Sequence, residues 1–156
     1  MKYVVLVIVI ALAVIYFTKS ANNKKAAVEN IAIGKAFLAT NKTLEGVIET
    51  ASGLQYQILE KGEGTEHPGA RTKVKVHYHG SLLDGTVFDS SVDSGKPISF
   101  GLNQVISGWT EGVQLMVAGD KFKFFIPSSL GYGNSSSGKI TAGSLLVFEV
   151  TLLEIQ

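Results

Sequence analysis

The sequence predicts an α+β domain in which an antiparallel sheet carries a short helix on one face, and two observations indicate it. From Ser52 onward glycine becomes frequent, and short runs alternate apolar and polar residues between turn signals, a pattern typical of β-strands. One stretch, NQVISGWTEGVQLM at 103–116, breaks this alternation and is typical of a short helix. Several strands with one helix favour an antiparallel sheet packed on that helix, and roughly 100 residues suffice for one such core.

The chain opens with an apolar run from Tyr3 to Phe17 that no charged residue interrupts. A membrane-spanning helix needs about 20 apolar residues and a signal-peptide core roughly 7–15, so the run lies at the border of both. It ends in the bulky and basic sequence IYFTKS rather than in small residues, which favours a retained anchor over a cleaved signal. A buried core helix is disfavoured, because a helix that is apolar on every face needs protein around it. Lysines on both sides of the run leave its orientation open.

Residues 22–45 are predicted to form a helix, because Ala, Lys, Glu and Leu are good helix formers and apolar residues recur at fair helical spacing. Asn22 or Asn23 can cap its start, and Asn41 is a plausible stop. This helix is either a solvated spacer or a dimerising element. The sequence therefore divides into a membrane anchor or signal segment at 1–20, a helical linker at 21–51 and the domain at 52–156.

The expected strands follow in order along the domain. LQYQILEKGEG at 54–64 places its apolar residues on one face and ends in a glycine-rich turn. TKVKVHYHGSLL at 72–83 alternates valine and tyrosine with lysine and histidine. DGTVFDSS at 84–91 begins with the Asp-Gly pair that is typical of a hairpin turn. Two further strands are expected in KFKFFIP at 121–127 and in SLLVFEVTLLEI at 144–155.

The composition excludes several classes of function. A net charge of +1, without Lys/Arg clusters and interleaved aromatics, gives no footprint for nucleic acid, so no nucleic-acid partner is expected. The absence of cysteine removes disulfides, thiol nucleophiles and cysteine-zinc sites. No G-x-S-x-G elbow, Walker motif or dinucleotide glycine motif is present. His77 and His79 share a strand face without an evident third ligand, so a solvent-facing pair is favoured over a metal site, and no metal or other cofactor is expected.

Aromatic residues come from different expected strands, from the helix and from one loop: Tyr78, Phe88, Phe100, Trp109, Tyr132 and Phe148. Trp109 is the only tryptophan, and it follows Gly108 in the first turn of the short helix. Composition alone favours the interpretation that most of these rings fill the core. The alternative is that they line one cleft.

Three segments resemble the FKBP-type peptidyl-prolyl cis-trans isomerases in order and at near-constant spacing: VHYHGSLLDGTVFDSS, KPISFGLNQVISGWTEGVQLMVAGDKFKFFIPSSLGYG and LLVFEVTLLEI. The resemblance covers about two thirds of the chain, from Ser52 onward. A further segment, GKAFLATNKTLEGVIETASGLQY, resembles the end of the long helix in the bacterial macrophage infectivity potentiator subfamily. That subfamily has a dimerisation domain where this sequence has the apolar run, so the resemblance does not extend to dimerisation. It implies a bent antiparallel sheet wrapped around one short helix, preceded here by an N-terminal apolar helix and a helical linker.

The resemblance also implies a cleft between the helix and the concave face of the sheet, with Trp109 as its floor. It assigns catalytic positions to the side chains of Tyr78, Asp89 and Tyr132 and to the backbone N–H of Ile106. It assigns substrate contact to residues of the wall, floor and lip: Phe88, Ile98, Phe100, Val105, Trp109, Ile140 and Phe148. Two departures from the family bear on substrate preference. Ile98 stands where many relatives have a larger aromatic residue. The short 133–144 loop lacks the proline pair that, in many relatives, follows the isoleucine matching Ile140.

The implied activity is peptidyl-prolyl cis-trans isomerisation, which breaks no bond and needs neither a nucleophile nor a cofactor. The alternative is a membrane-tethered chaperone or peptide-binding module with little isomerase activity. Proline-containing polypeptides are the implied substrates, and macrolides are the implied inhibitors. With the apolar run as an anchor, the expected location is the bacterial inner membrane with the domain in the periplasm. With a cleaved signal, it is the soluble periplasm.

Overall fold

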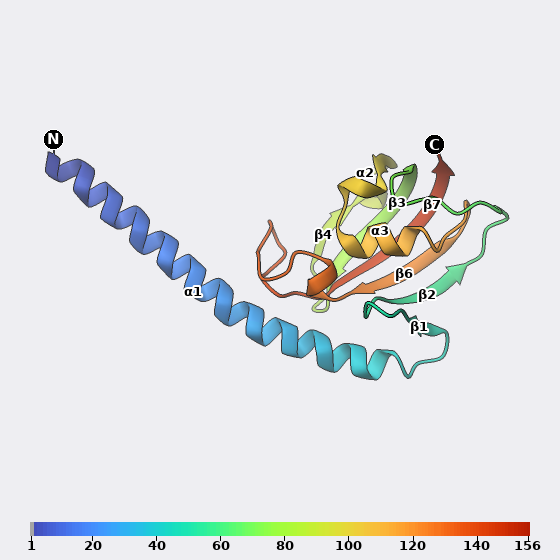
Figure 1. Cartoon of the computed structure of the whole chain (residues 1–156), viewed down its shortest axis with the longest axis horizontal. Helices are drawn as coiled ribbons and strands as arrows, with labels where there is room; N and C mark the ends of the chain where they lie inside the picture. The colour runs from blue at the N-terminus through green and yellow to red at the C-terminus, as the bar shows by residue number, and fades with distance from the viewer. Residues whose placement is uncertain (1) are drawn as a thin grey trace.

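The computed structural model describes residues 2–156, and its first element is one long helix. Helix α1 (Lys2–Asn41) runs without a break from the apolar run into the expected linker helix and ends at Asn41, as the sequence indicated. Its first half projects away from the rest of the chain (Figure 1), and nearly all side chains from Val4 to Phe17 are exposed. Its length and hydropathy meet the requirement for crossing a membrane, a requirement that signal sequences also meet.

One antiparallel sheet follows α1 and forms most of the domain (Figure 1). Its strands lie in the order β1-β2-β6-β7-β3-β4. β5 pairs with the first half of β3, and β4 pairs with the second half of β3. Their bounds are β1 (Val47–Glu49), β2 (Gln55–Glu60), β3 (Lys73–Leu82), β4 (Val87–Ser90), β5 (Ile98–Gly101), β6 (Lys121–Ile126) and β7 (Leu146–Ile155).

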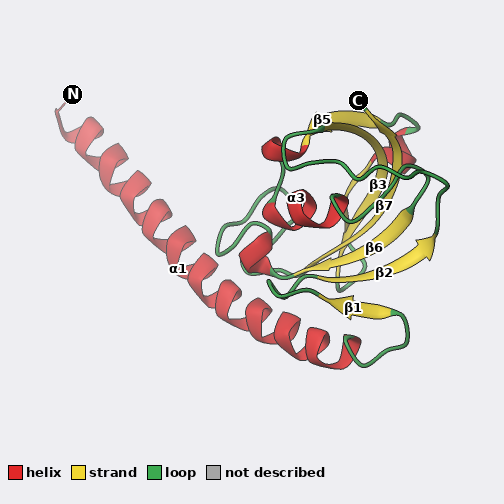
Figure 2. Ribbon diagram, turned by 45° about the vertical axis from the view of Figure 1, so that its right-hand side comes forward, coloured by secondary structure: helices red, strands yellow, loops and turns green. Residues whose placement is uncertain are grey.

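Two register irregularities mark where the central strand β3 departs from a flat ladder, one at Lys75/Val76 against β7 and one at Gly80/Ser81 against β4. Such irregularities bend a strand and increase its twist. The sheet curves around helix α3 (Ser107–Val113), as Figure 2 shows. The structure therefore confirms the predicted fold class.

The remaining elements are short: α2 (Ser91–Ser94) and the 3-10 turns η1 (Leu102–Gln104) and η2 (Ser128–Leu130). Helix α3 is shorter than the expected 103–116, because Val105 is extended (φ −122°, ψ 171°) and separates η1 from α3. Strand β1 was not expected, and it lies inside the predicted linker. It is held by its pairing with β2, in which Ile48 lies opposite Tyr56.

Two glycines allow α3 to approach the sheet closely. A Cβ atom on Gly108 would lie 2.6 Å from Cγ2 of Ile126, and one on Gly112 would lie 2.6 Å from Cε1 of Phe124. Both distances are shorter than any ordinary van der Waals contact, so only glycine fits without a shift of the sheet. The close approach seats Trp109, which is only 4% exposed, against the concave face.

The second half of α1 packs against the domain through small, polar and apolar side chains, and the ring centroid of Phe37 lies 5.7 Å from that of Phe125. Ala27 is buried, and a Cβ on Gly143 would lie 2.6 Å from the Ala27 carbonyl oxygen. Asn30 Nδ2 donates hydrogen bonds to the Ala142 carbonyl at 2.9 Å and to Thr141 Oγ1 at 3.1 Å. The contacts of Ala27 and Asn30 attach the helix to the chain segment that precedes β7.

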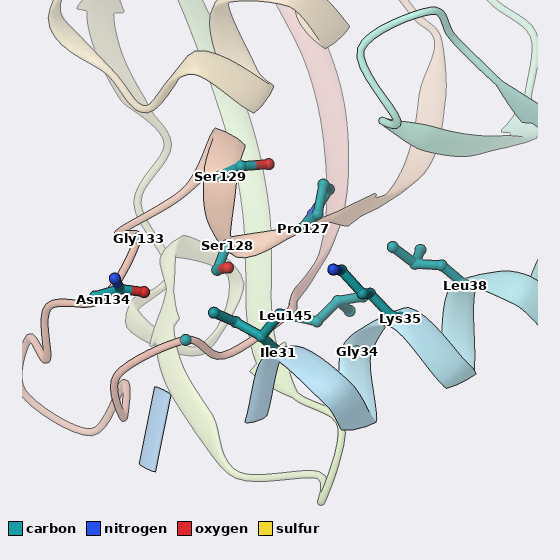
Figure 3. Close-up of a pocket in the computed structure, with 11 residues that line it drawn as sticks. Ile31, Gly34, Lys35, Leu38, Pro127, Ser128, Ser129, Gly133, Asn134 and Leu145 are labelled. Atoms are coloured by element: carbon teal, nitrogen blue, oxygen red, sulfur yellow. The ribbon is translucent and has the colours of Figure 1, made fainter. Parts of the chain in front are cut away.

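Further along α1, the docking continues to the last turn of the helix. Figure 3 shows Ile31, Lys35 and Leu38 on the helix beside the segment around Pro127 and Ser128, where a cavity of about 350 Å³ lies between the two. Buried Gln55 then closes the contact. Its amide nitrogen donates to the Leu38 carbonyl at 2.9 Å, and its amide oxygen accepts from Asn41 Nδ2 at 2.9 Å. The predicted linker helix is therefore part of the packed structure from Ala27 to Asn41.

Candidate active site

A cleft of about 440 Å³ opens beside α3, and the residues that line it come from β3, β4, β5, β7, α3 and the segments beside η1 and η2. They are Tyr78, Asp89, Phe100, Gln104, Val105, Ile106, Trp109, Tyr132 and Phe148. Of the eleven positions predicted from the sequence, eight are brought together here. The aromatic residues thus serve both proposed purposes, because Tyr78, Trp109 and Phe148 are core residues that also line the cleft.

Trp109 forms the base of this cleft, and three rings surround its indole. The ring centroids of Tyr78, Phe100 and Phe148 lie 5.4, 5.3 and 5.3 Å from that of Trp109, at interplanar angles of 87°, 60° and 88°. Edge-to-face contacts of this kind are the favoured geometry of aromatic pairs. They hold the indole in place where it lines the cleft, so the base is apolar and rigid.

The hydroxyl of Tyr78 and the carboxylate of Asp89 form a polar pair on the wall. Tyr78 Oη donates to Asp89 Oδ2 at 2.6 Å. Burial and then this hydrogen bond raise the pKa of the Tyr78 hydroxyl well above its ordinary value of about 10. Tyr78 is therefore a fixed donor at neutral pH, and it orients the carboxylate. The pair is positioned by β3 and β4, where Gly80 lies opposite Asp89.

Two hydrogen-bond donors of the cleft are not used within residues 2–156. Tyr132 follows η2, its side chain is 41% exposed, and its hydroxyl has no partner among the described residues. Ile106 precedes the first residue of α3, and its backbone N–H likewise has no backbone partner in the described part of the chain. Both groups are therefore free to bind carbonyl oxygens of a ligand.

Three predicted contact residues do not line the cleft. Phe88 packs behind its wall, with its ring 5.3 Å from that of Phe148 and nearly perpendicular to it. Ile98 lies on β5 opposite Val76 and is 40% exposed. Ile140 is buried in the core beside the loop that carries Tyr132.

The cleft also contains a residue that the sequence did not suggest. Gln104 ends η1, and its side-chain oxygen accepts a long hydrogen bond of 3.4 Å from the Gly101 N–H. The sequence signal that could have indicated Gln104 is its position directly before Val105 and Ile106, two residues predicted to contact substrate.

His77 and His79 lie on the other face of β3, away from the buried side chains of Val76 and Tyr78. His77 Nδ1 is 2.9 Å from Ser91 Oγ, and His79 Nδ1 is 2.9 Å from Ser90 Oγ. Within residues 2–156 no three His, Cys, Asp or Glu side chains form a group that could hold a metal ion. Both rings thus bond to hydroxyls at the start of α2.

Comparisons with known proteins agree with this geometry. Residues 64–153 match the family of FKBP-type peptidyl-prolyl cis-trans isomerases. Residues 10–58 match the domain amino-terminal to FKBP-type peptidyl-prolyl isomerase, and this match begins inside the apolar run. The sequence had suggested that the run replaces that domain, whereas the match shows that the two overlap.

Individual relatives are similar over most of this chain. The isomerase FkpA of Aeromonas hydrophila is 57% identical over 136 residues, which are 87% of this chain and 50% of that protein. The outer membrane protein MIP of Legionella longbeachae is 45% identical over 88% of this chain and 59% of its own length. The chain thus spans about half the length of the curated relatives it matches.

The fold is shared with a solved structure, that of FkpA from Escherichia coli. The match has a TM-score of 0.88 and 38% identity, and it covers 96% of this chain and 70% of that one. The family match alone spans residues 64–153, more than half of the chain. The chain therefore belongs to the FKBP-type peptidyl-prolyl cis-trans isomerases, in the branch of FkpA and the macrophage infectivity potentiators.

Proposed function

We propose that this chain accelerates rotation about X-Pro peptide bonds in polypeptides. The observation that carries the proposal is the indole of Trp109 at the base of an open, ring-lined cleft beside α3. A proline ring is small and apolar, and it fits such a base. The barrier to rotation is roughly 18–20 kcal/mol because resonance gives the C–N bond double-bond character. Uncatalysed X-Pro bonds consequently isomerise in tens to hundreds of seconds.

The apolar lining acts on the difference between the planar and the twisted amide. The planar amide is charge-separated and is stabilised by water, whereas the twisted amide at the top of the barrier is less polar. A cleft walled by Trp109, Phe100 and Phe148 therefore disfavours the planar form relative to the twisted one. An enzyme accelerates the rotation of a bound substrate only if it stabilises the transition state more than the ground state.

The free donors would orient the substrate. The Tyr132 hydroxyl and the Ile106 N–H lie at the cleft and would bind substrate carbonyls, which restricts the peptide to a conformation close to the twisted state. Asp89, held by Tyr78, would keep a fixed negative charge at the wall. No group needs to transfer a proton, because rotation breaks no covalent bond.

The experiment is the refolding of a protein whose slow phase is limited by proline isomerisation, in the presence of the full chain in detergent. Catalytic amounts should shorten the slow phase. Unchanged slow-phase kinetics with suppressed aggregation would contradict the proposal and support the chaperone alternative. Competition by a macrolide would test the related proposal that macrolides occupy the same cleft.

We further propose that the apolar part of α1 inserts into a membrane. The support is an exposed helix that meets the length and hydropathy requirement, together with a relative that is named an outer membrane protein. This proposal includes the division into an anchor or signal segment at 1–20, a helical linker at 21–51 and the isomerase domain at 52–156. It also places the anchor in the inner membrane and the domain in the periplasm. Resistance of the full chain to alkaline extraction from membranes would support the anchor. Release by alkali or processing near residue 20 would favour the signal alternative.

A further inference from the structure

Helix α1 connects the apolar segment to the domain without a flexible linker. Residues 18–26 continue the helix between the exposed run and the docked part that begins at Ala27. Flexible linkers let a tethered domain rotate freely, whereas a continuous helix transmits direction. Because Ala27, Asn30 and Asn41 are fixed by packing and hydrogen bonds, the domain has one orientation relative to the helix axis.

One loop of the domain reaches back along α1 toward the apolar segment. Residues 134–136 and the helix residues between Tyr16 and Lys24 line a common hollow of about 520 Å³. Figure 1 shows this loop, in orange-red, at the end of the domain from which the helix projects. Lys19 lies two residues after the last apolar residue, Phe17, which is about 3 Å along the helix axis. The loop therefore lies level with the end of the apolar surface.

The chemistry of this region suits lipid headgroups. The loop sequence NSSSGK at 134–139 is exposed and offers hydroxyls, an amide and one ammonium group. The helix adds Lys19, Lys24 and Lys25, and neither the loop nor residues 16–25 contain a carboxylate. Tyr16 and Phe17 are exposed at the end of the run, where aromatic residues typically meet the membrane interface. Lysines near an anionic surface attract it.

We propose that the 134–139 loop rests in the headgroup layer of an anionic bilayer, so that the cleft acts on prolines close to the membrane surface. This rests on the proposed insertion of the apolar part of α1. The loop begins two residues after Tyr132, which lines the cleft, so a loop held at the bilayer brings the cleft to it. The substrate class is then polypeptide segments next to their own membrane insertion or attachment point.

Because the chain contains no cysteine, single cysteines can carry a fluorophore at chosen depths. The full chain is reconstituted in vesicles of phosphatidylcholine and phosphatidylglycerol at about three to one, an anionic surface. Ser136→Cys reports the loop, Glu66→Cys reports the exposed β2–β3 connection, and Val9→Cys reports the apolar segment. Quencher lipids carry a nitroxide either on the headgroup or deep in the acyl chain.

The proposal expects the headgroup quencher to remove most of the emission at residue 136 and little of that at residue 66. The acyl-chain quencher should remove most of the emission at residue 9. The loop contact would be wrong if the headgroup quencher acted equally weakly on residues 136 and 66. Strong quenching of residue 9 by the acyl-chain quencher would in that case still support the insertion. Weak quenching at residue 9 would overturn the insertion and this inference with it.

A charge reversal tests the electrostatic part. Lys139→Glu should lower the headgroup quenching at residue 136 in the anionic vesicles, with a smaller effect in phosphatidylcholine alone. Lys61→Glu, an exposed lysine just after β2, is the matched control and should leave the quenching unchanged. Equal effects of the two substitutions would show that the lysine of the loop does not contact the anionic surface.

Discussion

The Tyr78 hydroxyl donates a hydrogen bond to Asp89 across the gap between β3 and β4, with an oxygen–oxygen distance of 2.6 Å. The raised pKa of Tyr78 makes the stability of the fold depend on alkaline pH. A group whose pKa is higher in the folded than in the unfolded state stabilises the fold below its unfolded pKa and loses this contribution as the pH rises. We expect stability to fall as the pH rises above about 10, the ordinary pKa of tyrosine. Denaturant titrations of wild type and Tyr78→Phe should diverge below that pH and converge above it. Parallel curves would contradict the assignment.

Trp109→Ala should abolish turnover and also cost roughly 3–5 kcal/mol of unfolding free energy, since it removes a buried aromatic side chain from the core. Chemical denaturation gives the stability, and the refolding assay gives the activity. Full activity in a folded Trp109→Ala protein would show that the indole is not the base of a working site.

Tyr132→Phe should lower turnover with little change in stability, because the hydroxyl is at the cleft and has no partner among the described residues. Tyr56→Phe is the matched control, since Tyr56 stacks on Phe122 and does not line the cleft. If Tyr132→Phe unfolded the domain, or if Tyr56→Phe lost as much activity, the proposed hydrogen bond to substrate would be wrong.

Gly112→Ala should destabilise the domain by about 1–3 kcal/mol, as overpacking does, because its methyl group would meet the Phe124 ring. Gly69→Ala is the control. There a Cβ would meet only the Thr72 hydroxyl at 3.4 Å, and the backbone has no positive φ. Thermal unfolding of both variants distinguishes a specific close approach from a general intolerance of alanine.

Asn30→Ala should loosen the docked helix by removing the hydrogen bonds to Thr141 and Ala142, at a cost of about 1 kcal/mol. Amide hydrogen exchange should rise around residues 141–143, where Gly143 also bonds to the Gly133 carbonyl. Asn22→Ala, on an exposed turn of the same helix, should change neither the stability nor the amide exchange of residues 141–143. Unaltered exchange in Asn30→Ala would mean that the amide does not hold this segment.

The sequence was sufficient where a pattern reflects burial directly. Val74, Val76 and Tyr78 alternate with less buried residues in β3, as their spacing predicted. It was insufficient for β1, whose three residues are ordered by pairing with β2 rather than by a pattern of their own. The docking of α1 was only partly visible in the sequence. Phe37, one of the apolar residues at helical spacing, does pack on Phe125, but Ala27 and Asn30 make their contacts through small size and hydrogen bonds. Gln104 was missed for a similar reason, since only the fold turns it toward the cleft.

The order of strands in space differs from their order in the chain, and this has a consequence for biosynthesis. β7 is the last strand of the sheet to be synthesised, yet it lies between β6 and β3 at its centre. Long-range pairings of this kind form late and slowly. On the ribosome, the concave face of the sheet is incomplete until β7 has emerged. The apolar part of α1 emerges much earlier. If the apolar part of α1 is the proposed anchor or signal, its recognition during synthesis would precede domain folding. A chain stalled before β7 would expose unpaired strand edges and become a target for proteases.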